Sequence, residues 1–218
     1  MRADGFWWYR WHPDAGIGFT PEWERPIEGY ILRSGNCFVD VGSHVGRWTL
    51  RASPFYRKIL AFEPDPFTNF VLRRNLARND ITNVLAFSTA LSNRRARADL
   101  FNYGPLACNS LRDVHVSGQT AKGATSVEVR PLDDFMNHFQ APMVVKIDVE
   151  GEELKVLEGG ASTFKKFKPL VLVEVHFRSE IDAIVDKMKS YDYTISGQFQ
   201  DSSNPKGVTY LVGRSQEV

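Results

Sequence analysis

Hydrophobic residues along the chain alternate between the spacing of a β-strand and that of a helix. Short apolar runs predict strands at residues 37–41, 59–62, 84–90, 143–148 and 170–175. Segments with helical spacing or helix-start signals lie between or beside them, at residues 26–34, 47–50, 65–76, 132–139, 152–158 and 179–188. Strands that alternate with helices indicate βαβ units, and such units build a parallel sheet. The pattern therefore predicts an α/β fold.

Two of the helices carry start signals. Asp65 precedes Pro66 and is predicted to cap a helix whose apolar stripe is Phe67, Phe70, Val71 and Leu76. Ser179 stands three residues before Asp182, a spacing typical of a capping box. That box is predicted to open a helix with the stripe Ile181, Ile184, Val185 and Met188.

Three regions depart from the alternation. Residues 91–129 contain glycines and Pro105 and only two short strand-like pieces, 98–101 and 126–129, so they predict a loop or hairpin insertion. Strand patterns at 193–195 and 208–212 predict a terminal antiparallel hairpin. The first residues form an aromatic arm without periodicity, with Trp7, Trp8, Trp11 and Trp23. We expect an arm with a short helix over 1–34 and the folded domain over 35–218.

Composition limits the class of protein. With 218 residues the chain is of single-domain size, and 43% hydrophobic residues exclude a disordered chain. No window approaches the roughly 18 uncharged apolar residues of a membrane span, and the first residues lack the apolar core of a signal peptide. We therefore expect a soluble cytoplasmic protein, with Cys37 and Cys108 as reduced thiols.

The charge is nearly balanced, with 27 Lys and Arg against 26 Asp and Glu. A chain without a cationic excess lacks the field that dominates non-specific nucleic-acid binding. The balance is uneven along the chain, because residues 36–130 carry 13 basic and 7 acidic groups and residues 131–218 carry 10 and 14. The basic middle segment keeps RNA as a rival acceptor.

A glycine turn follows the first strand. Ligands of open α/β sheets bind at the carboxyl ends of strands, and here Asp40 is followed by Gly42 and Gly46. The spacing differs from the G-x-G-x-x-G of dinucleotide sites, and His44 stands where their middle glycine would be. Glu63 ends the second strand, the usual place for a carboxylate that binds ribose hydroxyls. A nucleoside without a pyrophosphate fits, and S-adenosyl-L-methionine is the common ligand of this kind. The alternative is a turn that serves tight packing only.

Charged residues interrupt the strand at 143–148. Strands of a parallel sheet are covered on both faces and should be apolar, yet Lys146, Asp148 and Glu150 occupy alternate positions. With a period of two, these three side chains should point the same way. Glu174 and His176 repeat the pattern on the next strand, so we expect five ionisable groups to meet beside Asp40. The alternative is an ion-pair network at the strand ends.

Methyl transfer to a hydroxyl needs a group that takes the proton. Asp148, Glu150 and His176 are each candidate bases, and Lys146 completes the expected catalytic set. The residue types would also suit a divalent ion held by Asp148, Glu150, Glu174 and His176. Because no tight ligand motif is present, we expect no metal.

Six segments together resemble the FkbM-type S-adenosylmethionine-dependent methyltransferases: residues 38–50, 62–66, 90–93, 129–134, 145–159 and 173–176. The block Lys-Ile-Asp-Val-Glu-Gly-x-Glu at residues 146–153 is the most specific. The resemblance implies a class I methyltransferase (Rossmann-like) fold, with a seven-stranded mostly parallel sheet, a C-terminal antiparallel hairpin and helices on both faces. It also implies O-methylation of a sugar or natural-product hydroxyl.

The same resemblance assigns cofactor binding to Asp40, Gly42, Gly46 and Glu63, and it places Asp148 and Glu150 beside the methyl group. Ser43 and His44 stand where the family commonly has Ala-Asn. We expect a cofactor site completed by Ser43, His44, Pro64, Leu91 and Asp148.

We therefore expect an S-adenosylmethionine-dependent methyltransferase acting on a small molecule or glycan. Rivals are an RNA or protein methyltransferase, a non-catalytic nucleoside-binding module, and an NAD-dependent dehydrogenase. A homodimer is compatible with the sequence.

Overall fold

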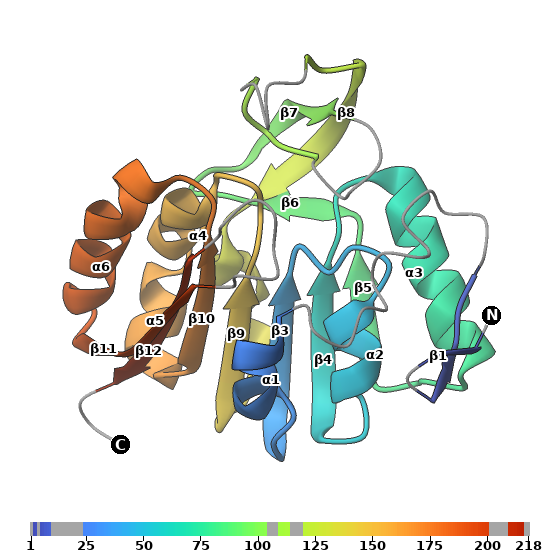
Figure 1. Ribbon diagram of the computed structural model, residues 1–218, viewed down its shortest axis with the longest axis horizontal. Helices are drawn as coiled ribbons and strands as arrows, with labels where there is room; N and C mark the ends of the chain where they lie inside the picture. The colour runs from blue at the N-terminus through green and yellow to red at the C-terminus, as the bar shows by residue number, and fades with distance from the viewer. Residues whose placement is uncertain are drawn as a thin grey trace.

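The computed structural model describes residues 2–3, 5–9, 24–103, 109–113, 120–200 and 209–215. Its centre is a seven-stranded sheet of order β11-β12-β10-β9-β3-β4-β5 (Figure 1). The strands are β3 (Gly35–Val41), β4 (Tyr56–Phe62), β5 (Val84–Phe87), β9 (Met143–Ile147), β10 (Leu170–Val175), β11 (Tyr193–Gln200) and β12 (Thr209–Ser215).

Strand β12 alone runs against its neighbours, because it pairs antiparallel with both β10 and β11. The other pairs of this sheet are parallel. The chain moves outward from β3 to β4 and β5 on one side and from β9 to β10 on the other, so the topological switch point lies between β3 and β9. Asp40 and Lys146 are partners in register at that point. This is the expected class I methyltransferase topology with its terminal hairpin.

Helices cover both faces of the sheet, because alternate strand residues point to opposite sides. Phe38, Val144 and Leu172 pack on the face of α1 (Arg25–Ile31) and α2 (Arg47–Ala52). Val39, Val145 and Val173 pack on the opposite face. The helices on that second face are α4 (Glu153–Gly159), α5 (Ala161–Phe167) and α6 (Ile181–Lys189). The core is therefore divided by the sheet into two apolar layers.

Helix α3 (Pro66–Arg78) begins where the sequence predicts. The Asp65 carboxylate accepts hydrogen bonds from the Thr68 N–H at 2.7 Å and from the Thr68 hydroxyl at 2.8 Å. The predicted stripe is partly wrong, because Phe67 and Phe70 are each 49% exposed. Val71 and Leu76 of that stripe are buried as predicted, and the buried face is completed by Thr68, Asn69, Leu72 and Asn75.

The predicted capping box of α6 is wrong. A short 3-10 turn, Arg178–Glu180, precedes the helix, and no side chain caps it. Ile184 and Met188 of the predicted stripe are buried in the core as expected. The predicted helix at 152–158 ends before the glycines at 159 and 160, as α4 nearly does, but no pattern in the sequence predicts α5, which begins directly after them. Residues Leu132–His138 form a 3-10 helix rather than an α-helix.

The insertion forms a small sheet of its own, of order β6-β8-β7 (Figure 1). The predicted strand 84–90 is split, since β5 ends at Phe87 and β6 (Thr89–Leu91) joins this second sheet. Strands β7 (Ala96–Asn102) and β8 (Gly123–Arg130) pair antiparallel, which confirms the expected hairpin. The small sheet stands above the carboxyl ends of the main strands (Figure 1).

Part of the aromatic arm is described. Strands β1 (Arg2–Ala3) and β2 (Phe6–Trp7) pair with each other, and the side-chain amide of Asn79, directly after α3, accepts from the N–H of Trp7 and donates to its carbonyl. Trp8 is buried and Trp7 is exposed. Trp11, Trp23 and Cys108 lie outside the described residues. No helix among the described residues has the length and apolar character needed to cross a membrane.

Replacing Asp65 by Ala should lower the free energy of unfolding by about 1 kcal/mol, because the first turn of α3 loses its side-chain acceptor. Urea unfolding measures the difference. The matched control is Ser179→Ala, which should change stability by less than about 0.5 kcal/mol, since that hydroxyl caps nothing. Equal losses in the two variants would contradict this account of both helix starts.

Candidate functional site

The turn after β3 adopts left-handed backbone at three positions. Gly42 and Gly46 have φ values of 82° and 99°, and His44 between them has φ 50°. Such values are easy for glycine and uncommon for other residues. The N–H groups of Gly42 and Ser43 donate to the carbonyl of Phe62 at the end of β4. The turn is thus fixed at the carboxyl edge of the sheet.

Both glycines are also required by packing. A Cβ added at Gly42 would overlap the carbonyl oxygen of Asp148, and one at Gly46 would overlap the side chains of Leu50 and Leu72. Tight packing, the alternative reason for a glycine turn, therefore explains why both positions are glycine. It has a functional consequence, because the contact at Gly42 places the turn directly against the segment that follows β9.

Asp40 lies at the end of β3 and is 1% exposed. Its Oδ2 accepts a hydrogen bond of 2.5 Å from the Thr49 hydroxyl, whereas its Oδ1 has no partner among the described residues. Burial raises the pKa of this carboxyl to about 6, although Lys146 and Thr49 act in the opposite direction. The Ser43 hydroxyl and the Trp48 indole N–H are likewise buried without a described partner. Buried polar atoms left unpaired around one turn are unusual, and they make this turn a candidate ligand site.

Glu63 follows β4 and is 7% exposed. Its Oε2 accepts from the His44 N–H and its Oε1 from the Asp65 N–H, each at 2.9 Å. Burial raises the pKa of Glu63 to about 7 despite these two hydrogen bonds. Pro64, the next residue, is half-buried. The side chain of Leu91 belongs to the apolar core, so any contact it made with a ligand would use its backbone.

Lys146 is a buried cation in the centre of the sheet. Its Nζ lies 2.7 Å from Asp148 Oδ2 and 3.6 Å from Oε1 of Glu24, which precedes α1. Glu24 in turn lies 3.2 Å from Nε of Arg47. Desolvation lowers the pKa of Lys146, but Asp148, Glu24 and Asp40 outweigh it and hold the pKa far above its ordinary value. Lys146 is therefore charged, and it balances the acids around it.

The predicted strand alternation does not extend to Glu150. Strand β9 ends at Ile147, and Glu150 lies in a turn with φ 52°, followed by Gly151 with φ 110°. The Ser110 hydroxyl from the insertion donates to the Glu150 carbonyl at 2.8 Å. The Glu150 side chain still joins the cluster, although it does so through a turn and not through the period of a strand.

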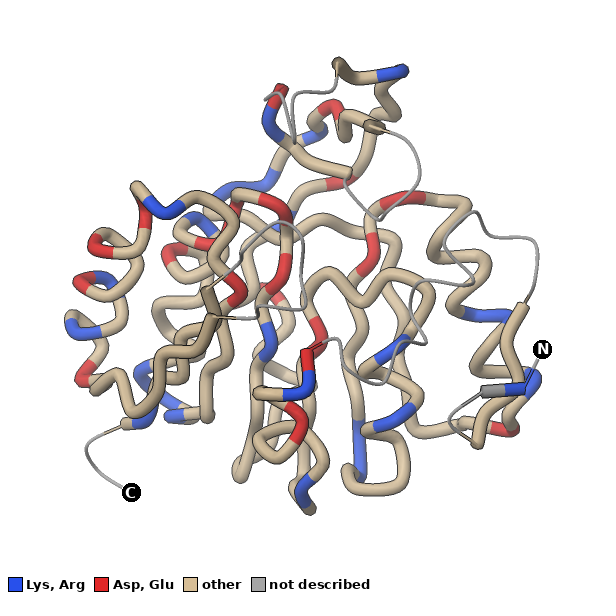
Figure 2. Tube along the Cα trace, in the orientation of Figure 1, with Lys and Arg blue, Asp and Glu red and all other residues tan. Residues whose placement is uncertain are grey.

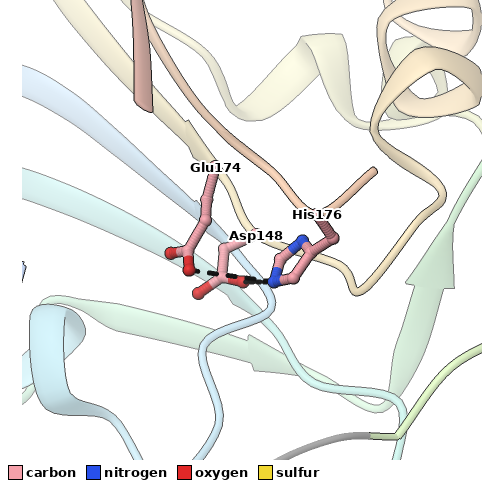
Figure 3. Close-up of side chains that lie close together, drawn as sticks. All are labelled: Asp148, Glu174 and His176. Atoms are coloured by element: carbon pink, nitrogen blue, oxygen red, sulfur yellow. Dashed lines mark ion pairs between the residues drawn. The ribbon is translucent and has the colours of Figure 1, made fainter. Parts of the chain in front are cut away.

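His176 follows β10, and its imidazole is the meeting point of the cluster. Its Nε2 lies 3.5 Å from Glu150 Oε2, 3.6 Å from Asp148 Oδ1 and 3.7 Å from Glu174 Oε1. Figure 3 shows Asp148 and Glu174 directed toward this nitrogen. Burial lowers the pKa of His176, but the surrounding carboxylates outweigh it and hold the pKa well above its ordinary value. The pKa of Glu174 is raised by burial first and then by Asp148.

Acidic groups gather at the carboxyl ends of β9 and β10 (Figure 2). One ligand atom from each of Asp148, Glu174 and His176 lies within 4.8 Å of the others. Carboxylate and imidazole groups at this spacing suit an ion-pair cluster as well as a divalent ion. The Lys146 ammonium, bonded to Asp148 at 2.7 Å, already supplies a cation to that carboxylate.

Sequence reasoning placed the five predicted ionisable groups correctly at one edge, beside Asp40. It missed Glu24, because nothing before α1 marks that residue as a partner of Lys146. It also missed Arg112 of the insertion, whose guanidinium pairs with Glu152 and Glu180 and so ties the insertion to α4 and α6. Glu153 belongs to the motif at residues 146–153, but its contact with His176 has no counterpart in the sequence prediction.

Residues 40–195 match the methyltransferase FkbM domain. Methyltransferase sdnD of Sordaria araneosa is 29% identical over 198 residues, covering 75% of this chain and 76% of the relative. Hexuronic acid methyltransferase AglP of Haloferax volcanii is 31% identical over 139 residues, covering 63% and 54%.

Among solved structures, methyltransferase FkbM from Methylobacillus flagellatus superposes with a TM-score of 0.59 at 21% identity, covering 93% of this chain and 50% of that one. The chain thus spans only about half the length of this structure and of the Haloferax relative. The domain match covers most of the fold and the whole cluster. The chain belongs to the FkbM family of S-adenosylmethionine-dependent methyltransferases.

Proposed function

We propose that this protein transfers a methyl group from S-adenosylmethionine to a hydroxyl of a small molecule or sugar. The observation that carries the proposal is the imidazole of His176, faced by three carboxylates where the segment after β9 packs against the Gly42 turn. A hydroxyl is a poor nucleophile until a base accepts its proton, and this edge of the sheet offers such a base.

The turn after β3 supplies the cofactor contacts in this proposal. Asp40 Oδ1 and the Ser43 hydroxyl are buried and lack described partners. The amino-acid part of bound S-adenosylmethionine would supply hydrogen-bond partners for both. Gly42, His44 and Gly46 contribute backbone, and Pro64 and Leu91 border the adenosine side. The Glu63 carboxylate is held by two N–H groups and retains lone pairs for ribose hydroxyls. When bound, the cofactor supplies a methyl group activated by a positively charged sulfur.

We assign the base to His176 and the surrounding roles to its neighbours. A raised pKa makes the neutral imidazole a stronger proton acceptor, which suits the weakly acidic hydroxyl of a sugar, and it also means that the active neutral ring gains population as the pH rises. Asp148 and Glu150 face Nε2 and stabilise the positive charge that develops there. Lys146 holds Asp148 through its 2.7 Å bond and prevents that carboxylate from turning away.

Two observations favour a sugar hydroxyl as the methyl acceptor: the name of one relative and the negative charge of the cluster. One relative carries the name hexuronic acid methyltransferase, which favours a sugar. A uronic acid offers both hydroxyls and a carboxylate to a methyl donor. The acidic cluster would repel a carboxylate at the reacting position but tolerates a neutral hydroxyl. A sugar hydroxyl is therefore the favoured acceptor.

Replacing Glu63 by Gln should weaken binding of S-adenosylhomocysteine roughly tenfold, because a charged acceptor of ribose hydrogen bonds is lost. For the wild type, binding should also weaken as the pH falls below the Glu63 pKa of about 7. Protonation turns the carboxylate into a poorer hydrogen-bond acceptor, so the affinity for S-adenosylhomocysteine should decrease as the pH falls. Calorimetry measures both effects.

The pH dependence separates a specific role of Glu63 from general damage. The Glu63→Gln protein should show a flatter pH dependence than the wild type, while Glu128→Gln on β8 should behave as the wild type does. Wild-type protein that fails to bind S-adenosylhomocysteine would overturn the cofactor assignment. Equal affinity in the Glu63→Gln protein would remove Glu63 from it.

Replacing His176 by Gln should reduce methyl transfer by about 10²-fold or more, since the proton acceptor is lost. The assay incubates protein, S-adenosylmethionine and a panel of neutral sugars and uronic acids, and mass spectrometry detects products heavier by one CH₂. The matched control is His138→Gln, on the 3-10 helix outside the cluster, which should retain full activity.

Two further experiments identify the type of bond that is formed and whether a metal is needed. Mild alkali removes a methyl ester but leaves a methyl ether intact, so an alkali-labile product would overturn the hydroxyl assignment. Activity should survive removal of divalent ions by a chelator. Loss of activity on chelation, restored by one added metal, would replace the proposed base with a metal at the same cluster.

A further inference from the structure

Glu153 is the last residue of the Lys-Ile-Asp-Val-Glu-Gly-x-Glu block, and the function proposed above gives it no task. It opens α4 and is 0% exposed. A carboxylate removed completely from water is costly to a fold unless it is paired or useful. Its neighbour Glu152 is also buried, but it has ordinary ion-pair partners in Arg112 and Lys155.

The two oxygens of Glu153 have different surroundings. Oε1 lies 2.7 Å from Nδ1 of His176 and accepts a hydrogen bond of 2.9 Å from the Gly151 N–H. Oε2 is buried and has no hydrogen-bond partner among the described residues. The contacts of this side chain thus run through one oxygen to the imidazole and to the turn that carries Glu150.

This contact determines which nitrogen of His176 carries the hydrogen in the neutral ring. A carboxylate can only accept, so Nδ1 must donate to it. Nε2 is then the atom with the free lone pair, and it faces the carboxylates of Asp148, Glu150 and Glu174. The bond from the Gly151 N–H keeps the Glu150 turn in register with the same imidazole.

We propose that Glu153 is a positioning residue: it holds His176 with Nε2 toward the acceptor, and it fixes the Glu150–Gly151 turn beside that nitrogen. The catalytic consequence rests on the proposed role of His176 as base. The positioning itself does not depend on the reaction, because it concerns the ring of one residue in the free protein.

The charged groups that face His176 come from every element packed around it. Glu153 approaches from α4 and Glu174 from β10, while Asp148 and Glu150 approach from the segment after β9. Lys146 of β9 acts through Asp148. Glu150, Glu153 and Glu174 raise the pKa of His176 against the effect of burial. Removal of one of these charges should therefore lower that pKa.

The test compares Glu153→Gln with Glu152→Gln, two neighbouring buried acids changed in the same way. Glu153→Gln should lower kcat by ~10 to 100-fold, the size typical for an outer residue that orients a histidine. KM for the cofactor should change less than about twofold. The rise of kcat with pH should move to lower pH, because a neutral His176 is the active form and its pKa falls. Glu152→Gln should leave the pH profile in place.

Nuclear magnetic resonance of ¹⁵N-labelled histidine gives a readout without cofactor or acceptor. In the wild type at high pH, His176 should show hydrogen on Nδ1 only, and its titration should lie well above that of an ordinary histidine. Glu153→Gln should give a mixture of the two ring forms and a titration at lower pH, with the amide pattern of the folded protein retained.

The outcomes separate this inference from the proposed function. An unchanged ring form and an unchanged His176 titration in Glu153→Gln would overturn the positioning role, even if methyl transfer is confirmed. A shifted ring form in a protein that methylates no hydroxyl would retain the positioning role and overturn the proposed reaction. If Glu153→Gln fails to fold, Glu153→Asp replaces it. The shorter carboxylate should keep the charge, withdraw from Nδ1 and give a mixed ring form.

Discussion

Buried charge at the carboxyl ends of β9 and β10 is the constraint on which the rest of the site depends. Carboxylates removed from water must find cations or donors nearby, since an isolated buried charge is strongly unfavourable. Lys146 meets this need from within the sheet, with Asp148 and Glu24 beside it and Asp40 as its partner in register. On the other side, His176 is shared by its neighbouring carboxylates. The segment before α1 contributes Glu24 and the start of α4 contributes Glu153 to these pairings.

Much of the fold could be predicted from periodicity, because apolar strands covered on both faces leave an unmistakable pattern. The failures share a cause: local patterns do not show what a segment packs against. Phe67 and Phe70 have helical spacing with the core residues, yet they are exposed. Ser179 and Asp182 match a capping motif, but a 3-10 turn places the helix start after Ser179. After Phe87 the chain stays extended but passes from the main sheet into the small sheet, and no residue in the sequence marks that transition.

The candidate site was predictable wherever a residue ends a strand. Parallel strands bring their carboxyl ends to one edge, so Asp40, Glu63, Asp148 and His176 could be expected together. Partners from distant segments were not predictable, because packing of the segment before α1 brings Glu24 to Lys146 and packing of the insertion brings Arg112 to Glu152 and Glu180. The role of Glu153 is an intermediate case, since the motif contains the residue and only the folded helix shows which nitrogen of the histidine it faces.

Glu24 limits where the arm can be cut off or exchanged without disturbing the sheet. Its carboxylate lies between Arg47 of α2 and Lys146 of β9, although it precedes the first helix. Anyone who trims this protein to its sheet, or exchanges its arm for that of a relative, would remove the acid that separates two buried cations. The shortest useful fragment is thus set by electrostatics and not by where regular secondary structure begins. When arms are exchanged between relatives, Glu24 should therefore stay with the domain that contains Arg47 and Lys146, and should not move with the arm.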